Sequence, residues 1–461
     1  MRRLAWVLSC SALVGCGTEV FGPARIARPY VNVTSVDANL TNVLAASITA
    51  TLVRADSARV SYHIVGATGD SVTPAIDAND TLQLPVYGLL AGQAYAFRVI
   101  AYGAGGTTTS DSVTLTTGAL PLDLPSFTTT GTSSANGYVV FSSGKYGLVI
   151  DYTGRVVWYH AFEPSGPGLN FIAQSNGRYA AQPPAPGATP VWHEIAPSGE
   201  LTRTFGCTRG LAPRFHDLIR ETDDSYWIIC DDVRTVDLSG IGGNAAAKVT
   251  AAEIQQIGAN GILQFSWSAF DYLDITDLDP ASRGGAVVNW THANAIALND
   301  DGTLVVSFRN LNEIIAINTS TGSIDWRLGG MRDDYGLAAC CGTLFSRQHG
   351  VRFTADGNVV LLDNSGTPGD SRVRRYSLDV AQRQAQSRGA FSATPPVVAG
   401  VGGSVQELPS GNILAAFGDG ARVEEINANG DVVWRIDGNP GYVFRAQRIA
   451  SLYAPGVGTS R

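Results

Sequence analysis

The sequence predicts an all-β protein in which a six-bladed β-propeller follows a small β-sandwich. The 461 residues include 52 glycines, and only 16% are charged, a balance typical of many short strands joined by tight turns. Asn/Asp-Gly turns also recur at one phase along most of the chain, as radially repeated sheets require. A chain of this length suits one large unit and one smaller unit.

The first 25 residues are predicted to be an export signal and a tether. A basic start precedes an apolar stretch, Leu4–Val14, which is too short to span a bilayer. The tetrapeptide LVGC resembles a bacterial lipobox, which implies lipidation of Cys16 and removal of residues 1–15. An ordinary signal peptide cut elsewhere is the alternative. Because glycine rather than aspartate follows the cysteine, we expect residues 16–25 to tether an exported protein to the periplasmic face of the outer membrane or to the cell surface.

Residues 26–118 are predicted to form the sandwich. Short alternating runs such as AASITATLVRAD and QAYAFRVIAYG are separated by Gly, Asp and Asn, at the spacing of immunoglobulin-like strands. The end of this segment resembles a fibronectin type III domain, with Tyr95 placed like the core tyrosine of that family. His63 lies inside a predicted strand, where a structural or exposed role is favoured over a catalytic one. The proline-containing residues 119–127 are expected to be a stiff linker.

Residues 128–461 repeat two kinds of segment, and this repeat predicts the propeller. One kind is a turn and a strand that ends in an aromatic, as in APSGELTRTF and NANGDVVWRI. The other is a turn that opens an apolar strand, as in NDDGTLVVSF and ADGNVVLLD. They alternate in six passes, each long enough for a four-stranded sheet. A long sandwich is the competing architecture, but it would not require such turns to recur at the same phase.

Export makes disulfides available to the four cysteines that follow the leader. Three pairings are open, and Cys207 with Cys230 is the simplest. Cys340 and Cys341 would then bridge each other or stay free, although cross-pairing is equally compatible with the sequence. None of the four has the paired Cys-x-x-Cys spacing of a zinc site, so sulfur ligation of a metal is not expected.

Three histidines occupy corresponding positions in successive predicted blades. His216, His292 and His349 each precede a hairpin turn at a similar spacing. Strands that start together on a closed ring point their first side chains toward one mouth of the channel, so we expect these imidazoles to converge. The turn at residues 300–301 would place Arg309 opposite His292 on the neighbouring strand.

Three imidazoles and a guanidinium suit the transfer of a sulfuryl or phosphoryl group. Arginine and fixed donors stabilise charge on the equatorial oxygens, a neutral imidazole can attack the central atom, and a second imidazole can move a proton. The alternatives are a propeller that binds a sulfated or phosphorylated ligand without turnover, and a metal-dependent hydrolase. Uncharged imidazoles anchor anions poorly, and the guanidinium would repel a metal ion, so we expect catalysis with neither metal nor cofactor.

The remaining polar and aromatic candidates receive structural interpretations. His160 and His193 lack the shared spacing and are predicted to be surface or packing residues. Trp290 and Phe171 are expected in the cores of the blades rather than stacked on a ligand. The net charge of −8 comes without any run of Lys or Arg, which excludes a nucleic-acid partner.

Four segments closely resemble the bacterial arylsulfotransferases, which use no nucleotide sulfate donor such as PAPS. They are WTHANAIALNDDGTLVVSFRNLNEIIAINTSTGSIDWRLGG, SRQHGVRFTADGNVVLLDN, SRVRRYSLD and GSVQELPSGNILAAFGDGARVEEINANGDVVW. They carry, in order, His-x-Asn, Ser-x-Arg, Trp-x-Leu-Gly-Gly, Gln-His and Asp-Asn, and the resemblance covers most of residues 130–455. It implies a propeller that moves a sulfuryl group from a phenolic sulfate ester to a phenolic acceptor, by a ping-pong mechanism through a sulfohistidine.

The resemblance also assigns roles by position. It makes His349 the sulfated nucleophile, and it gives His292 and Arg309 the tasks of holding the sulfuryl oxygens and assisting proton transfer. His216 fits the earlier histidine of the family. The adjacent cysteines at 340–341 depart from the separated pair of the best-studied members. Some relatives form dimers, and whether the sandwich mediates a homodimer here is open.

Overall fold

The computed structural model describes residues 26–163, 169–299, 301–335, 344–365 and 369–455. Strands dominate these residues. The helical elements among them are α1 (Ala269–Tyr272), η1 (Ser239–Ile241), η2 (Ile275–Asp277), η3 (Pro280–Ser282) and η4 (Arg309–Leu311). The predicted all-β class is therefore confirmed. None of the helices in the described ranges is long and apolar enough to cross a membrane.

The described chain divides into two compact units. The first comprises residues 26–35, 48–84 and 96–113, and the second comprises residues 36–47, 85–95 and 114–455. The N-terminal strands are β1 (Tyr30–Ala38), β2 (Ala45–Val53), β3 (Ser57–Ile64), β4 (Ser71–Val72), β5 (Ile76–Asp77), β6 (Thr81–Tyr87), β7 (Ala94–Gly103), β8 (Gly106–Thr109) and β9 (Val113–Thr116). The domain limits predicted at residues 118 and 127 stay predictions.

Two sheets build the first unit. One has the order β1-β2-β6, and the other has the order β4-β3-β7-β8, with β5 added to β3 and β9 to β7. Alternate residues of β2 are buried, as at Ile48 and Ala50, and β7 buries Phe97 and Val99 in the same way. Each sheet thus turns one face inward, as the two-residue period of a strand dictates.

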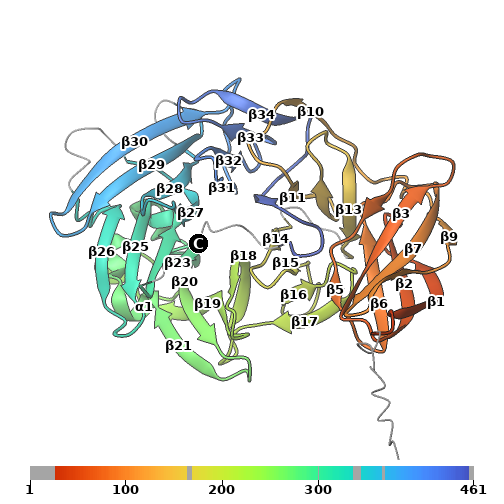
Figure 1. The fold of residues 1–461 in the computed structure, drawn as a ribbon. Coiled ribbons are helices and arrows are strands. Elements are labelled where there is room, and N and C mark those ends of the chain that lie inside the picture. Colours follow the sequence, from red (N-terminus) through yellow and green to blue (C-terminus); the bar gives the residue numbers. More distant parts are fainter. Residues whose placement is uncertain (1–25, 164–168, 300, 336–343, 366–368, 456–461) are drawn as a thin grey trace, which may run out of the picture. The chain divides into compact units, whose positions relative to one another are not determined.

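Six sheets of at least four strands account for most of the described second unit (Figure 1). The sheet β13-β12-β11-β35 contains β11 (Tyr138–Ser143), β12 (Tyr146–Ile150), β13 (Val156–Ala161) and β35 (Ala446–Ile449). The next contains β14 (Phe171–Ala173), β15 (Tyr179–Ala181), β16 (Trp192–Ile195) and β17 (Leu201–Phe205). The third contains β18 (Ala212–Arg220), β19 (Tyr226–Val236), β20 (Ala247–Ile257), β21 (Leu263–Ser268) and β22 (Val287–Asn289).

The other three sheets follow in chain order. The fourth contains β23 (Ala293–Leu298), β24 (Thr303–Phe308), β25 (Glu313–Asn318) and β26 (Ile324–Gly329). The fifth contains β27 (His349–Phe353), β28 (Val359–Asp363), β29 (Arg372–Asp379) and β30 (Gln384–Ser392). The sixth contains β10 (Thr128–Gly131), β31 (Ser404–Glu407), β32 (Ile413–Ala416), β33 (Val423–Ile426) and β34 (Val432–Asp437). Neighbouring strands in these sheets run antiparallel, apart from β22, which runs parallel to β20.

An edge strand of each of these sheets lies beside an edge strand of another. β18 contacts β23, β23 contacts β27, and β27 contacts β31 (Figure 1). β35 contacts both β31 and β14. Two sheets also join the beginning of the segment 128–455 to its end, because β10 pairs with β34 and β11 pairs with β35. Side chains on these edge strands are therefore brought together although they are far apart in the sequence.

Turn chemistry sets the register of the hairpins that carry the site. Between β23 and β24, the Asn299 amide donates to the Thr303 carbonyl over 2.9 Å, and the Asp301 carboxylate accepts from the Thr303 amide, also over 2.9 Å. Gly302 has a φ of +83°, in the left-handed region that favours glycine, and Gly357 at +77° has the same place between β27 and β28. The recurring Asp-Gly signal of the sequence thus marks equivalent hairpins in neighbouring sheets.

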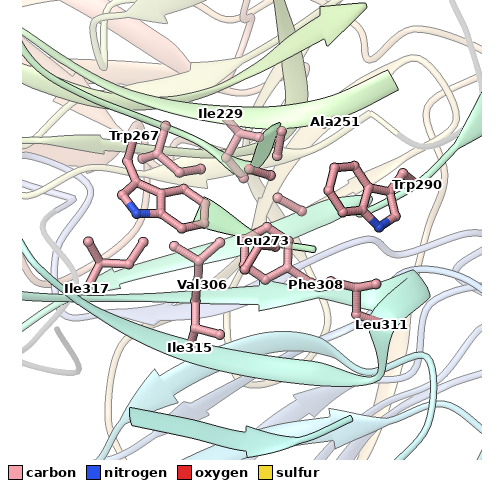
Figure 2. Packing of buried hydrophobic residues seen from close by; sticks show 14 of the residues in the cluster. Ile229, Ala251, Trp267, Leu273, Trp290, Val306, Phe308, Leu311, Ile315 and Ile317 are labelled. Atoms are coloured by element: carbon pink, nitrogen blue, oxygen red, sulfur yellow. The ribbon is translucent and has the colours of Figure 1, made fainter. Parts of the chain in front are cut away.

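A large apolar cluster packs between the third and fourth sheets (Figure 2). Trp267 on β21 lies over Val306 on β24 and Ile315 on β25, and all three side chains are at most 1% exposed. Full burial of each such side chain contributes roughly 1.5 to 3 kcal/mol. Phe308 belongs to the same cluster. Its packing therefore fixes the backbone position of the next residue, Arg309.

Candidate active site

The backbone places His292 and Arg309 opposite each other. Ala293 pairs with Phe308 across β23 and β24, and the Arg309 amide donates to the His292 carbonyl over 3.1 Å. His292 has a φ of +52°, which is uncommon for a residue with a side chain and marks a locally strained position. This is the pairing expected from the turn, although β24 ends one residue earlier, because Arg309 already begins η4.

His349 begins β27 and is held by one of its two ring nitrogens. Its Nδ1 lies 2.8 Å from Oδ1 of Asn364 and 3.1 Å from the carbonyl oxygen of Arg347. The Asn364 Nδ2 group donates to the carbonyls of Ala399 and Gly402, so its Oδ1 must be the acceptor. Because both neighbours of Nδ1 accept, Nδ1 carries the proton and the lone pair of the neutral imidazole is on Nε2.

His292 has the opposite tautomer. Nδ2 of Asn289 lies 2.7 Å from Nδ1 of His292, and an amide nitrogen can only donate. Nδ1 of His292 is therefore the acceptor, and its Nε2 carries the hydrogen. One imidazole thus offers a lone pair and the other offers an N–H donor.

His216 lies beside His292 but is positioned differently from the other two histidines. The centroids of the two rings are 4.9 Å apart. His216 lies inside β18 rather than at its start, in a stretch where the pairing with β19 shifts register between Pro213 and Leu218. Its Nδ1 is buried and has no hydrogen-bond partner among the residues that the structure describes. Register also shifts between Ala293 and Ala295, after His292, and between His349 and Arg352, so all three strands pair irregularly beside their histidine. The shared register of the three histidines stays a prediction.

Burial and positive charge keep the three imidazoles neutral. Burial, followed by Arg214 and Arg309, lowers the pKa of His292 to about 3. Burial also lowers the pKa of His349 to about 4, opposed by its hydrogen bond to Asn364 and assisted by Arg309. The pKa of His216 lies well below its usual value for the same main reason. At neutral pH the site therefore presents uncharged imidazoles beside guanidinium groups.

Arg309 keeps unused hydrogen-bonding capacity. Its guanidinium donates to Oδ1 of Asn310 over 3.0 Å and to the carbonyl of Gly400 over 3.3 Å, and both partners are neutral. Its Nε is buried without a partner among the described residues. Burial, with the neighbouring Arg347, lowers the pKa of Arg309 from its ordinary value. An anionic oxygen at this position would supply both the missing acceptor and the missing charge.

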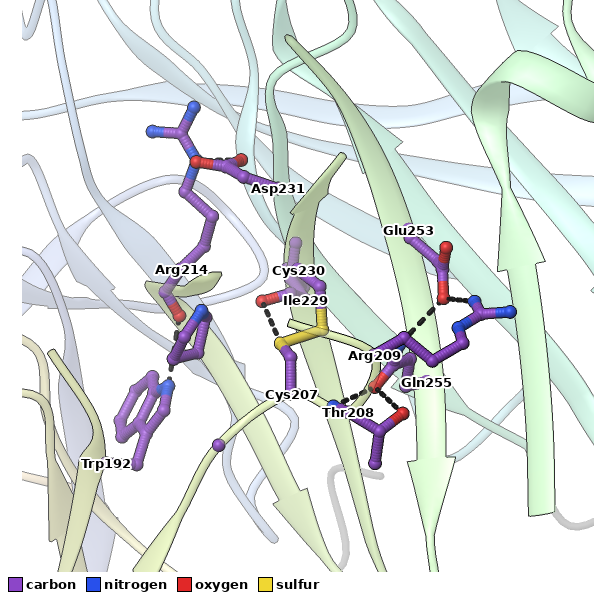
Figure 3. Close-up of a disulfide and its surroundings, with 12 residues drawn as sticks. Trp192, Cys207, Thr208, Arg209, Arg214, Ile229, Cys230, Asp231, Glu253 and Gln255 are labelled. Carbon is purple, nitrogen blue, oxygen red and sulfur yellow. Dashed lines mark hydrogen bonds and ion pairs between the residues drawn. A yellow bond between two sulfur atoms is a disulfide. The ribbon is translucent and has the colours of Figure 1, made fainter. Parts of the chain in front are cut away.

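Sequence reasoning missed the aromatic and basic residues that complete the site. The Phe444 ring centroid lies 5.6 Å from that of His216 and 6.2 Å from that of His349. Arg214 is held by Asp231, and its carbonyl accepts from Trp192 Nε1 over 3.0 Å (Figure 3). Phe444 lies near the end of the chain, outside the segments with recognisable spacing. Arg214 carried a usable signal, since it lies two residues before His216.

One known protein family matches the segment that contains these strands. The arylsulfotransferase (ASST) family model matches residues 212–439, a segment that contains all three histidines and Arg309. The chain belongs to the arylsulfotransferase family. Among curated proteins, none matches this sequence.

Several solved structures are similar to this chain at low identity. A protein of unknown function from Bacteroides caccae is 12% identical, with 68% of this chain and 98% of that chain covered and a TM-score of 0.45. A streptogramin B lyase is 14% identical, with 68% and 84% covered and a TM-score of 0.39. The PQQ-bound aldose sugar dehydrogenase from Streptomyces coelicolor is 15% identical, with 70% and 97% covered and a TM-score of 0.34.

A disulfide ties the segment before β18 to β19, the strand that pairs with β18. Cys207 and Cys230 are bonded, which confirms the simplest pairing expected from the sequence (Figure 3). The other predicted cysteine pair, at 340–341, lies outside the described residues. Within the described ranges, no three His, Cys, Asp or Glu side chains gather as a metal site would require.

The aromatic residues considered from the sequence lie in the core. Trp290 is 1% exposed and belongs to the cluster of Figure 2, and Phe171 is fully buried in a cluster with Trp158. His160 stacks at 6.3 Å on Trp158, whereas His193 is half-buried on β16. Both histidines thus lie where packing residues were predicted.

Proposed function

We propose that this arylsulfotransferase moves a sulfuryl group from a phenolic sulfate ester to a phenolic acceptor, without a nucleotide sulfate donor, through a sulfohistidine on His349. The observation that carries the proposal is the fixed tautomer of His349, which leaves the Nε2 lone pair available beside Arg309. Family membership supports phenolic substrates and a sulfuryl group rather than a phosphoryl group.

In the first half-reaction, Nε2 of His349 attacks sulfur and forms an S–N bond while the ester S–O bond breaks. The phenolate leaves with the bonding electron pair and later takes a proton from solvent. Charge that spreads over the sulfuryl oxygens is stabilised by the Arg309 guanidinium and by the Nε2–H donor of His292. A low pKa suits His349, because a protonated imidazole has no lone pair for the attack.

In the second half-reaction, the acceptor oxygen attacks the same sulfur and the S–N bond breaks. The electron pair returns to Nε2 of His349, and the acceptor hydroxyl loses its proton. His216 is the imidazole whose Nδ1 lacks a partner among the described residues, so we assign it the transient uptake of this proton. The proton then passes to solvent, which balances the one taken by the departing phenolate.

The test is release of nitrophenol from p-nitrophenyl sulfate, with and without added phenol. We expect acceptor-dependent release in the wild type, loss of release in His349→Ala, and retention in His193→Ala, a control of the same residue type on β16. Intact mass measured without acceptor should rise by one SO3, and the rise should be absent in His349→Ala. Equal release without acceptor would show a sulfatase, and no release with any phenol would favour the binding protein considered above.

We also propose that the six sheets of the second unit are the blades of a six-bladed β-propeller. The contacts between edge strands of neighbouring sheets support this architecture. The pairings of β10 with β34 and of β11 with β35, which join the beginning and the end of the segment 128–455, support it as well. The fibronectin-like assignment is supported by Tyr95, which is 5% exposed and accepts a hydrogen bond from the Leu90 amide over 2.8 Å.

The lipoprotein assignment is a further part of this proposal. Cys16 and the rest of the leader lie outside the described residues, so their support is the lipobox resemblance alone. Metabolic labelling with a fatty acid, compared between the wild type and Cys16→Ser, tests the anchor. Fractionation of the labelled protein would then place it at the outer membrane or elsewhere.

A further inference from the structure

A cavity of about 540 Å³ lies along the later residues of β18 and β23. His216 lies in the middle of β18 and His292 precedes β23, whereas the cavity is lined by residues that follow them, such as Leu218 and Ile296. Its size lies within the range of small-molecule sites. None of the three histidines lines it.

A buried ion cluster forms one wall of this cavity. Asp217 bridges two arginines, with its Oδ2 3.1 Å from Arg352 and its Oδ1 3.1 Å from Arg445. The side chains of Asp217 and Arg445 are 2% and 3% exposed, and that of Arg352 is 13% exposed. One carboxylate therefore faces two guanidinium groups at a site where water screens charge poorly.

The arginines have more donors than this cluster uses. Arg445 also donates to the His216 carbonyl over 3.1 Å, but its buried Nε has no partner among the described residues. Arg352 donates to the carbonyls of Ile296 and Val351 over 3.2 and 2.7 Å. A buried guanidinium with an unused donor and uncompensated charge is costly unless an acceptor occupies the adjoining space.

The other charged residues around the cavity do not cancel this excess. Arg220 lines the cavity but is paired with Glu194 and Asp224. Glu221 lines the cavity beside Thr222, at a less buried turn between β18 and β19. Asp217, Arg352 and Arg445 together thus carry one net positive charge.

The rest of the lining combines apolar side chains with polar ones such as Ser175, Asn299 and Gln447. Side chains of Ile172, Leu218, Ile219 and Ile296 contribute to it, together with Gln174. An apolar body with one anionic end therefore matches the wall better than a bare inorganic ion does. We propose that this cavity is a binding site for a small organic anion, whose carboxylate or sulfate group bonds to Arg445 and Arg352 and whose apolar part packs on the β14, β18 and β23 wall. The proposal does not depend on the sulfuryl-transfer reaction.

The experiment measures binding of hexanoate and hexyl sulfate to the full chain by isothermal titration calorimetry, with neutral hexanamide as the control ligand. Hexanoate and hexyl sulfate distinguish a carboxylate from a sulfate as the preferred group. Thr222→Trp closes the cavity from an exposed turn, and Thr222→Ser is its matched control. Arg445→Gln removes the charge, and Arg375→Gln, an ion-paired arginine on β29, controls for loss of an arginine elsewhere.

We expect saturable binding of at least one anion, with hexanamide about tenfold weaker or worse. Thr222→Trp should abolish binding, and Arg445→Gln should weaken it about tenfold, while Thr222→Ser, Arg375→Gln and His349→Ala bind as the wild type does. If Arg445→Gln does not fold, the Thr222 pair decides the question. The proposal is overturned if neither anion binds at millimolar concentration, if hexanamide binds equally well, if Thr222→Trp still binds, or if His349→Ala abolishes binding.

Discussion

His349 and His216 are buried to nearly the same extent, 2% and 3% exposed, but the hydrogen bonds of their ring nitrogens differ. His349 begins β27, and its Nδ1 bonds to Asn364 and to the Arg347 carbonyl. His216 lies within the irregular part of β18, and its Nδ1 has no partner among the described residues. Burial makes both rings neutral, but only the hydrogen bonds decide which nitrogen is free to react.

The largest expected effect separates these two histidines directly. His349→Ala removes the atom that forms the S–N bond, so we expect kcat with p-nitrophenyl sulfate and phenol to fall by about four orders of magnitude or more. His216→Ala removes a proton acceptor that water can partly replace, so its loss should be about ten- to a hundredfold. Steady-state kinetics on both variants, with circular dichroism as the folding control, make the comparison. Equal losses would mean that the tautomer of His349 does not mark the nucleophile.

The next effect compares the two arginines that act on these rings. Arg309 has neutral partners and an unused Nε, whereas Arg214 is paired with Asp231. Arg309→Met should therefore lower kcat by about two to three orders of magnitude, as loss of a preorganised donor does. Arg214→Met should lower kcat by only about tenfold, because its charge is already compensated. Intact mass without acceptor should show slower sulfation in Arg309→Met, and the reverse ranking of the two variants would contradict the assignment.

A smaller effect tests the hydrogen bond that distinguishes His349. Asn364→Ala leaves Nδ1 with the Arg347 carbonyl as its remaining partner, so the ring is held less firmly, and kcat should fall about ten- to a hundredfold with little change in KM. Asn294→Ala is the matched control, because Asn294 is equally buried and donates to the Gln348 carbonyl, with no bond accepted from a histidine among the described residues. A change in KM alone, or an equal loss in the control, would indicate general disruption.

The surroundings of the histidines also show which parts of the site could be predicted from the sequence. The pairing of His292 with Arg309 was predictable, because antiparallel strands around an Asp-Gly turn pair by simple counting. The same counting from the Asp-Gly turn at Gly357 brings Asn364 near His349, although the sequence did not indicate the amide's role. The irregular pairing beside the histidines, which occurs in β18, β23 and β27, left no signal in the spacing.

Long-range packing accounts for most of what the sequence did not reveal. Phe444 lies two residues before β35, far along the chain from the histidines. The pairing of β35 with β11 brings it close to them. Arg445, the next residue, contacts Asp217 for the same reason. Such neighbours follow from how the first and last sheets close on each other, which local periodicity does not encode.

The smallest effect uses the pH dependence of stability to compare the same two rings. The pKa of His349 is lowered to about 4 and that of His216 lies well below its ordinary 6.5, so the unfolded chain binds protons that the folded chain does not. The free energy of unfolding should therefore fall as the pH falls below about 6.5, by up to about 1.4 kcal/mol per pH unit for each histidine. His349→Gln should remove its share of this slope between about pH 6.5 and pH 4.

His216→Gln should flatten the same curve and extend the flattening to lower pH, because the charged neighbours that act on His216 all oppose its protonation, whereas Asn364 favours that of His349. Urea unfolding at pH 4.5, 5.5, 6.5 and 7.5 measures each slope, and His193→Gln serves as the less buried control. If His216→Gln keeps the full wild-type slope, the folded protein binds a proton at His216 as readily as the unfolded chain does. The ring would then not be the neutral base that the second half-reaction requires.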